Sequence, residues 1–345
     1  MAKAKKLPSG NWRVRAYIGT DASGKKLYKS FTAETKKEAE YMATEYMMHQ
    51  NIKNNTGLNM TVGDAIEKYI DIKSNILSPS TVRSHRGILK NHLHGIRYVK
   101  LCDLTRDIIQ KEINIESAKH SPKTVKNVHG LLSAALKMYY PEFVLNTDLP
   151  QKEKTEIYIP SKKDVFTLLE HTKNDEQMHL AILLASCMGL RRGEICALTK
   201  QDIDMERKLL TVSKSMVLTD SKEWIVKQPK TYSGNRVLPI PDLVYSFLTG
   251  YNTTNDYLFT VTPNALSDRF FRLVKRIGIT PFTFHALRHY YASVMMTLNI
   301  PNKYAMQMMG HASDNMLKNV YQHTMIDKKK EVEQAVTQFF SNSDF

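Results

Sequence analysis

The chain has 345 residues, more than one ordinary domain holds, so two or three compact units are expected. Hydrophobic residues make up 42% of it, which suffices for packed cores and excludes general disorder. Lysine and arginine exceed aspartate and glutamate by 49 to 34, a formal charge of +15, which fits a polyanionic partner without proving one. The three cysteines form no Cys-x-x-Cys pair, and no apolar run reaches the roughly 20 residues that span a bilayer. The sequence therefore predicts a cytoplasmic protein with no disulfide framework, no cysteine zinc site and no membrane segment.

The first unit is a small basic sheet with one helix. Residues 10–32 alternate as β-strands around a turn at residues 21–24, and a helical period follows over residues 36–50. Residues 1–55 hold 11 basic and 5 acidic residues. We expect a three-stranded sheet plus helix over residues 1–56, with a polar linker at its end. Five basic or aromatic residues would share the solvent face of the sheet, where DNA contact is expected: Arg13, Arg15, Tyr17, Lys26 and Tyr28.

The second unit, residues 61–149, is predicted to be entirely helical. Helices are expected over 62–73, from 79 onward, from 105 to about 118, and from 121 to about 140, each preceded by a capping Ser or Thr. Four basic residues lie near the predicted helix N-termini, where phosphate groups bind readily: Arg83, Arg86, Lys123 and Lys126. A solvated surface charge remains the plain alternative for each of them.

A charged second linker at residues 148–154 precedes the third unit, residues 157–345. This unit is predicted to be mostly helical, with a short antiparallel meander of strands inserted between residues 209 and 239. The fold class is thus multidomain α+β.

Four separated segments of the third unit carry the residues that point to chemistry. They are Gly-Leu-Arg-Arg-Gly-Glu at 189–194, Pro-Lys-Thr at 229–231, His-Ala-Leu-Arg-His at 285–289, and Gly-His at 310–311 with a tyrosine ten residues later. Each alone has an ordinary structural explanation. Together they offer guanidinium, ammonium, imidazole and phenol groups without the carboxylates that Mg²⁺ prefers. Such a set suits the binding of a phosphodiester and its attack by a hydroxyl group.

At these positions the chain resembles the tyrosine recombinase (lambda-type integrase) family, whose signature is Gly-x-Arg-x-Gly-Glu, a turn Lys, His-x-x-Arg, Gly-His and Tyr. All of its positions are matched in order, and the likeness extends to the arm-binding and core-binding domains. The closest likeness is to integrases of Gram-positive conjugative transposons and phages. The resemblance implies the catalytic residues Arg191, Lys230, His285, Arg288, His311 and Tyr321, with Glu194 orienting Arg191.

The resemblance also implies what these residues do. Tyr321 attacks the scissile phosphate and becomes linked to the 3′ side of the break, while Arg191 and Arg288 clamp the phosphate oxygens. Lys230 protonates the departing 5′ oxygen, with His285 as acid or base. No metal, ATP or other cofactor is expected. The expected partners are duplex DNA, at core and arm sites, and an excisionase or host DNA-bending protein. The chain is also expected to form a homotetramer on DNA, joined by exchange of an amphipathic C-terminal helix over residues 326–345.

Three other functions remain open at this point. A type IB topoisomerase performs the same half-reaction on one duplex, and active-site residues alone do not separate the two. A DNA-binding regulator could keep the fold and cut nothing. A metal phosphohydrolase would use His285, His289, His311 and His323, although no carboxylates lie beside them.

Overall fold

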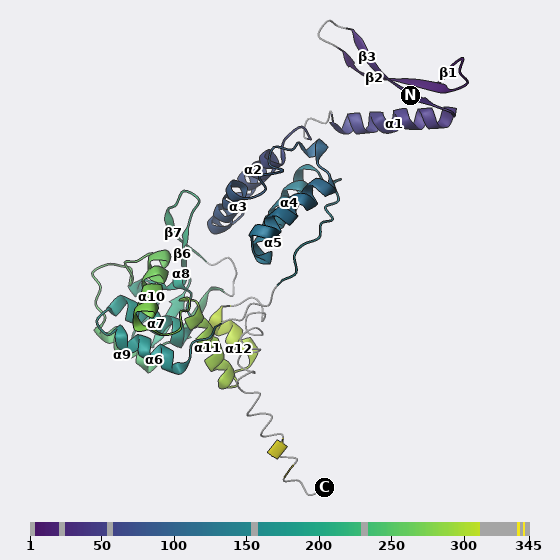
Figure 1. The fold of residues 1–345 in the computed structure, drawn as a ribbon. Helices are drawn as coiled ribbons and strands as arrows, with labels where there is room; N and C mark the ends of the chain where they lie inside the picture. The colour runs from purple at the N-terminus through teal and green to yellow at the C-terminus, as the bar shows by residue number, and fades with distance from the viewer. Residues whose placement is uncertain are drawn as a thin grey trace. The chain divides into compact units, whose positions relative to one another are not determined.

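The computed structural model describes residues 4–20, 25–53, 58–152, 158–228 and 234–310, together with residues 337, 338 and 341. The chain divides into two compact units, residues 1–77 with 81–153 and residues 154–345 with 78–80. Its elements are many helices and small antiparallel sheets (Figure 1). This confirms the mixed α and β fold class. The finer domain boundaries stay a prediction.

The N-terminal segment forms an antiparallel sheet in the order β1-β2-β3. Its strands are β1 (Lys5–Lys6), β2 (Trp12–Thr20) and β3 (Lys26–Ala33), and they are followed by helix α1 (Lys36–Lys53). The alternation predicted for β2 is confirmed in its described part, because Val14 is buried while Arg13 and Arg15 are exposed. Val14 packs with Ala39 and Ala43 of α1, so the helix covers one face of the sheet and leaves the basic face to solvent.

The all-helical segment that follows has the four helices that the capping pattern predicts. They are α2 (Val62–Lys73), α3 (Pro79–Asn91), α4 (Arg106–Lys119) and α5 (Pro122–Tyr139), with a single 3₁₀ turn η1 (Leu101–Asp103) before α4. The side chains of Thr61, Thr105 and Ser121 each accept a backbone N–H of the first turn that follows them. Ile66 and Leu132 belong to the buried core that holds the helices together.

The larger C-terminal unit is built around a buried central helix. Its helices are α6 (Lys162–His171), α7 (Glu176–Met188), α8 (Arg192–Ile195), α9 (Asp242–Gly250), α10 (Pro263–Ile277), α11 (Ala286–Thr297) and α12 (Asn302–Met309), with a 3₁₀ turn η2 (Lys200–Asp202). Residues 180–185 of α7 are at most 1% exposed, which makes this helix the centre of the core. Across the described residues, no helix is both long and apolar enough to cross a bilayer.

The strands of this unit form two sheets, so the single meander predicted from the sequence is wrong in its pairing. One sheet has the order β4-β5-β8 and the other is the hairpin β6-β7. The strands are β4 (Ile203–Asp204), β5 (Leu209–Val212), β6 (Ser215–Leu218), β7 (Trp224–Lys227) and β8 (Arg236–Pro239). β8 pairs with β5 because Leu238 lies opposite Leu210 and both are buried in the core. The strands of the hairpin have no fully buried residue, and Met216 of β6 packs against that core while only partly buried.

Candidate active site

The turn between α7 and α8 places Arg191. α7 ends at Gly189, whose φ of 67° is the left-handed conformation that favours glycine. A Cβ there would lie 2.4 Å from a ring carbon of Tyr291, so no side chain fits. Arg191 then occupies the N-cap of α8, where the Glu194 side chain accepts its backbone N–H at 2.9 Å. Local contacts within the glycine-arginine-glutamate motif therefore fix the direction of the Arg191 side chain.

Glu194 is a buried carboxylate held between two arginines. Its Oε1 accepts Nη1 of Arg191 at 2.7 Å, and its Oε2 accepts Nη2 of Arg236 at 2.9 Å. Burial alone would raise the pKa of Glu194, but the hydrogen bond and charge of Arg236, followed by the charges of Arg191 and Arg288, lower it to about 2. Glu194 is thus ionised at neutral pH and ties the two guanidinium groups together. This contact is the one expected of a residue that orients Arg191.

Arg236 is a member of this cluster that sequence reasoning missed. Its side chain is 3% exposed, and besides Glu194 it donates from Nε to the Met308 carbonyl at 2.8 Å. It therefore links β8 to α8 and to the end of α12. A signal for it exists in the sequence. In the alternating strand Arg-Val-Leu-Pro, Arg236 falls on the same inward side as Leu238, and a charged residue at such a position needs a buried partner.

Arg288 comes from the first turn of α11 and has no exposed surface. Its Nη1 donates to the Gly189 carbonyl and its Nη2 to the Met309 carbonyl, at the ends of α7 and α12. Helix C-termini carry partial negative charge, which favours a guanidinium there. Burial lowers the pKa of Arg288, as does the charge of Arg191 to a smaller degree. In this conformation two N–H groups of the Arg288 guanidinium donate to backbone carbonyls.

His285 precedes α11 and is exposed, unlike Arg288. Its ring meets that of His289 edge-on, with centroids 4.8 Å apart. Although the residue is exposed, nearby protein atoms displace part of the water around its ring, and this lowers the pKa of His285 to about 4, with further contributions from the charges of His289, Arg288, Arg191 and Arg192. The ring is therefore neutral at pH 7 and able to accept a proton. Within the described residues, Nδ1 of His289 has no hydrogen-bond partner.

Three of the predicted catalytic residues, Lys230, His311 and Tyr321, lie outside the described residues, and so does the apolar stripe of the predicted C-terminal helix. The segment that leads to His311 is nonetheless placed. The carbonyl of Gly310, the residue before His311, accepts Nη2 of Arg191 at 2.9 Å. The end of α12 is thus attached to the arginine cluster through three successive carbonyls, those of residues 308, 309 and 310.

The residues predicted to contact DNA fall into two groups. On the sheet, Tyr17 lies opposite Tyr28 with ring centroids 5.7 Å apart, and the guanidinium of Arg15 stands 4.8 Å from the Tyr28 ring centroid. Arg13 and Lys26 are exposed as well. This face therefore combines aromatic rings with positive charge.

The second group lies on the helical segment. Arg83 is exposed on α3, and Lys123 and Lys126 are exposed in the first turns of α5. Arg86 instead forms an ion pair with Asp71 at 2.9 Å. Phosphate contact by Arg86 would therefore compete with this intramolecular pair, whereas the other three residues present their charges to solvent.

The chain is similar to several known proteins. The model of the phage integrase family matches residues 159–327. A XerC-like tyrosine recombinase of Caldanaerobacter subterraneus subsp. tengcongensis is 26% identical over 95% of this chain and 96% of its own length. The transposase of transposon Tn916 from Enterococcus faecalis is 27% identical over 47% of this chain and 45% of its own length.

Solved structures share the fold at lower sequence identity. The integrase of transposon Tn1549, in complex with transposon right end DNA, superimposes with a TM-score of 0.66 at 20% identity, over 81% of this chain and all of that one. The lambda integrase tetramer bound to a Holliday junction gives a TM-score of 0.59 at 19% identity, over 91% of this chain and 96% of that one. Residues 159–327 thus form a phage integrase domain, and the chain is a tyrosine site-specific recombinase.

Proposed function

We propose that this recombinase integrates and excises a mobile element by conservative strand exchange at one composite site, which Arg191, Glu194, Arg236 and Arg288 organise and Tyr321 completes. The reaction needs neither metal nor ATP. The Tyr321 oxygen forms a bond to the scissile phosphorus as the bond to the 5′ oxygen breaks. The resulting 3′-phosphotyrosyl ester conserves the energy of the broken phosphodiester, so a 5′ hydroxyl of another strand can reverse the step.

The charge of the described cluster is the observation that carries this proposal. Arg191, Arg236 and Arg288 contribute +3 and Glu194 contributes −1, which leaves a surplus of +2 at the ends of α7, α11 and α12. Two of these arginines, Arg236 and Arg288, are buried beside the single buried carboxylate of Glu194, and an excess of buried cations is costly unless an anion offsets it. A phosphodiester whose charge grows in a pentavalent transition state is such an anion, and preorganised guanidinium groups stabilise it.

The proposed roles follow from what each side chain can reach. Arg191, the most exposed of the three arginines, clamps the phosphate while Glu194 holds its guanidinium, and Arg288 joins it in the clamp. Neutral His285 accepts the phenolic proton of Tyr321, Lys230 donates a proton to the departing 5′ oxygen, and His311 hydrogen-bonds a phosphate oxygen.

DNA contact by the rest of the chain completes the proposal. The exposed face with Arg15, Tyr17 and Tyr28 binds arm sites as the unit of residues 1–56. The helical unit of residues 61–149 and the catalytic unit of residues 157–345 both bind core sites. Its exposed Lys123 and Lys126 are placed where a helix N-terminus also favours phosphate.

Strand exchange between two duplexes requires four active sites, so a homotetramer on DNA is proposed, joined by exchange of the helix over residues 326–345. Val332, Val336 and Phe339 lie on the predicted apolar stripe of that helix. An excisionase or a host DNA-bending protein would set the direction of the reaction. The bacterial cytoplasm is the proposed location.

One experiment separates this function from its rivals. Purified full-length protein is incubated in excess EDTA with two labelled duplexes that carry the attachment sites, and products are resolved in denaturant. A recombinase yields a protein–DNA adduct and exchanged duplexes. An adduct with relaxation of a supercoiled plasmid but no exchange would indicate a type IB topoisomerase. Binding without an adduct would indicate a regulator, and cleavage only after metal addition would indicate a phosphohydrolase.

A further inference from the structure

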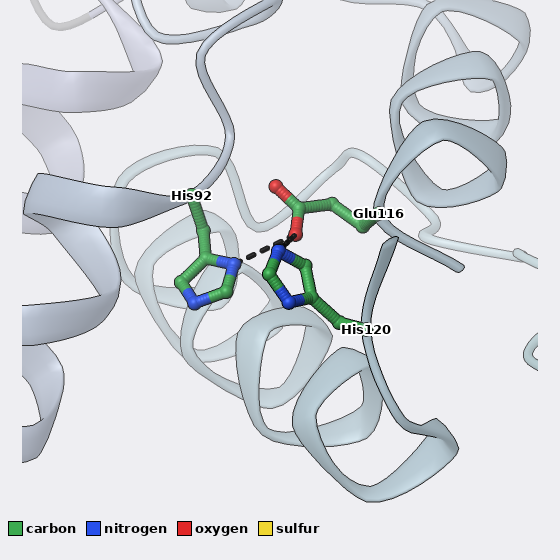
Figure 2. A group of neighbouring side chains, drawn as sticks. All are labelled: His92, Glu116 and His120. Atoms are coloured by element: carbon green, nitrogen blue, oxygen red, sulfur yellow. Dashed lines mark hydrogen bonds and ion pairs between the residues drawn. The ribbon is translucent and has the colours of Figure 1, made fainter. Parts of the chain in front are cut away.

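A cluster of two imidazoles and one carboxylate lies in the helical segment, within the unit that does not contain the arginine cluster. His92 follows the last residue of α3, Glu116 is in the last turn of α4, and His120 is the C-cap of α4. His92 Nδ1 is 2.7 Å from Glu116 Oε2, and His120 Nε2 is 3.6 Å from the same oxygen. Figure 2 shows both rings directed at that one atom. The ligand atoms of all three residues lie within 4.8 Å of one another.

A backbone hydrogen bond fixes the orientation of the Glu116 carboxylate. Glu116 Oε1 accepts the backbone N–H of Leu93 at 2.9 Å, which holds Oε2 toward the two rings. The side chains of Glu116 and His92 are 7% and 12% exposed, whereas that of His120 is 37% exposed. The cluster is thus a partly buried set of three ligand atoms that opens to solvent at His120. Outer contacts that orient ligands in this way are typical of metal sites.

We propose that His92, Glu116 and His120 bind a divalent transition-metal ion, with Zn²⁺ as the best match and a water molecule as fourth ligand. Two nitrogens and a single carboxylate oxygen suit zinc better than Mg²⁺ or Ca²⁺, which take mainly oxygen ligands. Tetrahedral ligands about 2.0–2.2 Å from zinc lie about 3.3–3.6 Å apart. The separation of His120 and Glu116 already matches, and that of His92 and Glu116 has to widen by about 0.6 Å.

The position of the site indicates a structural role. The ion would tie the residue after α3 to the last turn of α4 and to the corner at which Ser121 caps α5. The N-terminus of α5 carries Lys123, one of the proposed phosphate contacts. Metal binding would therefore stabilise the helical segment and hold the α4–α5 corner in place, without taking part in phosphoryl transfer.

The test compares zinc binding by three full-length proteins after removal of metal with a chelator. They are the wild type, His120→Ala, and the control His94→Ala, which removes an exposed histidine from the same loop. Zinc affinity and stoichiometry are measured by competition with a chromogenic chelator, and the Tm is measured with and without Zn²⁺. Zinc bound at His285 and His289 would be common to all three proteins, so the difference between variants isolates the cluster.

The wild type and His94→Ala should bind one more equivalent of Zn²⁺ than His120→Ala, or bind it at least about tenfold more tightly. Zn²⁺ should raise the Tm of these two proteins and leave the Tm of His120→Ala unchanged. Because His120 is exposed, its replacement should leave the fold intact, which the Tm in chelator verifies. Equal zinc binding by His120→Ala and the wild type overturns the proposal. A wild-type Tm that Zn²⁺ leaves unchanged also overturns it, since the Glu116 carboxylate would then only hydrogen-bond to the two rings.

Discussion

Replacement of Arg236 by methionine should strongly destabilise the C-terminal unit. Arg236→Met keeps much of the side-chain volume but removes the two hydrogen bonds to Glu194, at 2.9 and 3.3 Å, and the one to the Met308 carbonyl at 2.8 Å. Glu194 then keeps Arg191 as its remaining salt-bridge partner in the cluster. Breaking a buried pair from one side costs about 3–5 kcal/mol, because the other charge stays buried. At about 2–4 °C per kcal/mol for a domain of 150–250 residues, the Tm should fall by roughly 6–20 °C.

The assay is thermal unfolding of the full-length chain followed by circular dichroism, with Arg192→Met as the matched control. Arg192 is exposed and donates one hydrogen bond to Ser267 at 2.8 Å, so its replacement should lower the Tm by only about 1–3 °C. The double variant Arg236→Met/Glu194→Gln should lose less than the sum of the single losses, because both changes remove the same pair. If Arg236→Met melts within 2 °C of Arg192→Met, the account of Arg236 as a buried link is refuted.

Three further predictions concern acid stability, the clamp and modularity. The folded pKa values of Glu194 and His285, about 2 and about 4, both lie below their ordinary values of 4.5 and 6.5. Their contribution to stability is therefore complete above pH 6.5 and is lost as the pH falls, through His285 between 6.5 and 4 and through Glu194 between 4.5 and 2. The Tm measured against pH should decline over both windows. His285→Gln should make the upper decline smaller without removing it, because burial also lowers the pKa of His85, His129, His179 and His289. Arg191→Ala should slow single-turnover cleavage by about 10²–10³-fold with little change in DNA affinity, and a variant that loses binding while it keeps its cleavage rate would make Arg191 a positioning contact only. Deletion of residues 1–56 should abolish arm-site binding in a mobility-shift assay while core-site cleavage persists, and loss of core cleavage would contradict separate units.

The arginine cluster changes how one obvious variant should be interpreted. The predicted clamp role of Arg288 would make Arg288→Ala a direct probe of phosphate binding. The structure shows Arg288 fully buried on the carbonyls of residues 189 and 309, so alanine there removes packing and hydrogen bonds as well as charge. Loss of activity in that variant reports on stability first. Arg191, with a side chain that is 36% exposed, is the cleaner probe.

Local features were predictable from the sequence because short-range chemistry determines them. Thr61, Thr105 and Ser121 mark helix starts, since a hydroxyl beside free backbone N–H groups caps a helix wherever the rest of the chain goes. The buried face of β2 followed from alternation at Val14. The arginine, histidine and glycine motifs likewise identified the family, because each is a contiguous run of residues.

Long-range contacts were not predictable in the same way. The pairing of β8 with β5 depends on which strands pack into the core around α7. Adjacency in the sequence would pair each strand with the next one along the chain, as β6 pairs with β7. The link from Arg236 to Glu194 joins residues 42 positions apart. The His92, Glu116 and His120 cluster joins the residue after α3 to the end of α4, and its members form no run in the sequence. Each of these contacts forms only when the fold brings distant parts of the chain together, so the sequence alone does not reveal it.

The most direct test of the central claim is the identity of the residue that becomes linked to DNA. A core-site duplex with a nick that traps the cleaved strand is incubated with the wild type, Tyr321→Phe and the control Tyr304→Phe, which removes an exposed hydroxyl from α12. Adducts are counted on a denaturing gel, and the DNA-linked peptide is identified by mass spectrometry. We expect the wild type and Tyr304→Phe to form an adduct at Tyr321, and Tyr321→Phe to bind DNA with unchanged affinity and form none. An adduct in Tyr321→Phe, or a linked peptide that lacks residue 321, would contradict the proposed nucleophile.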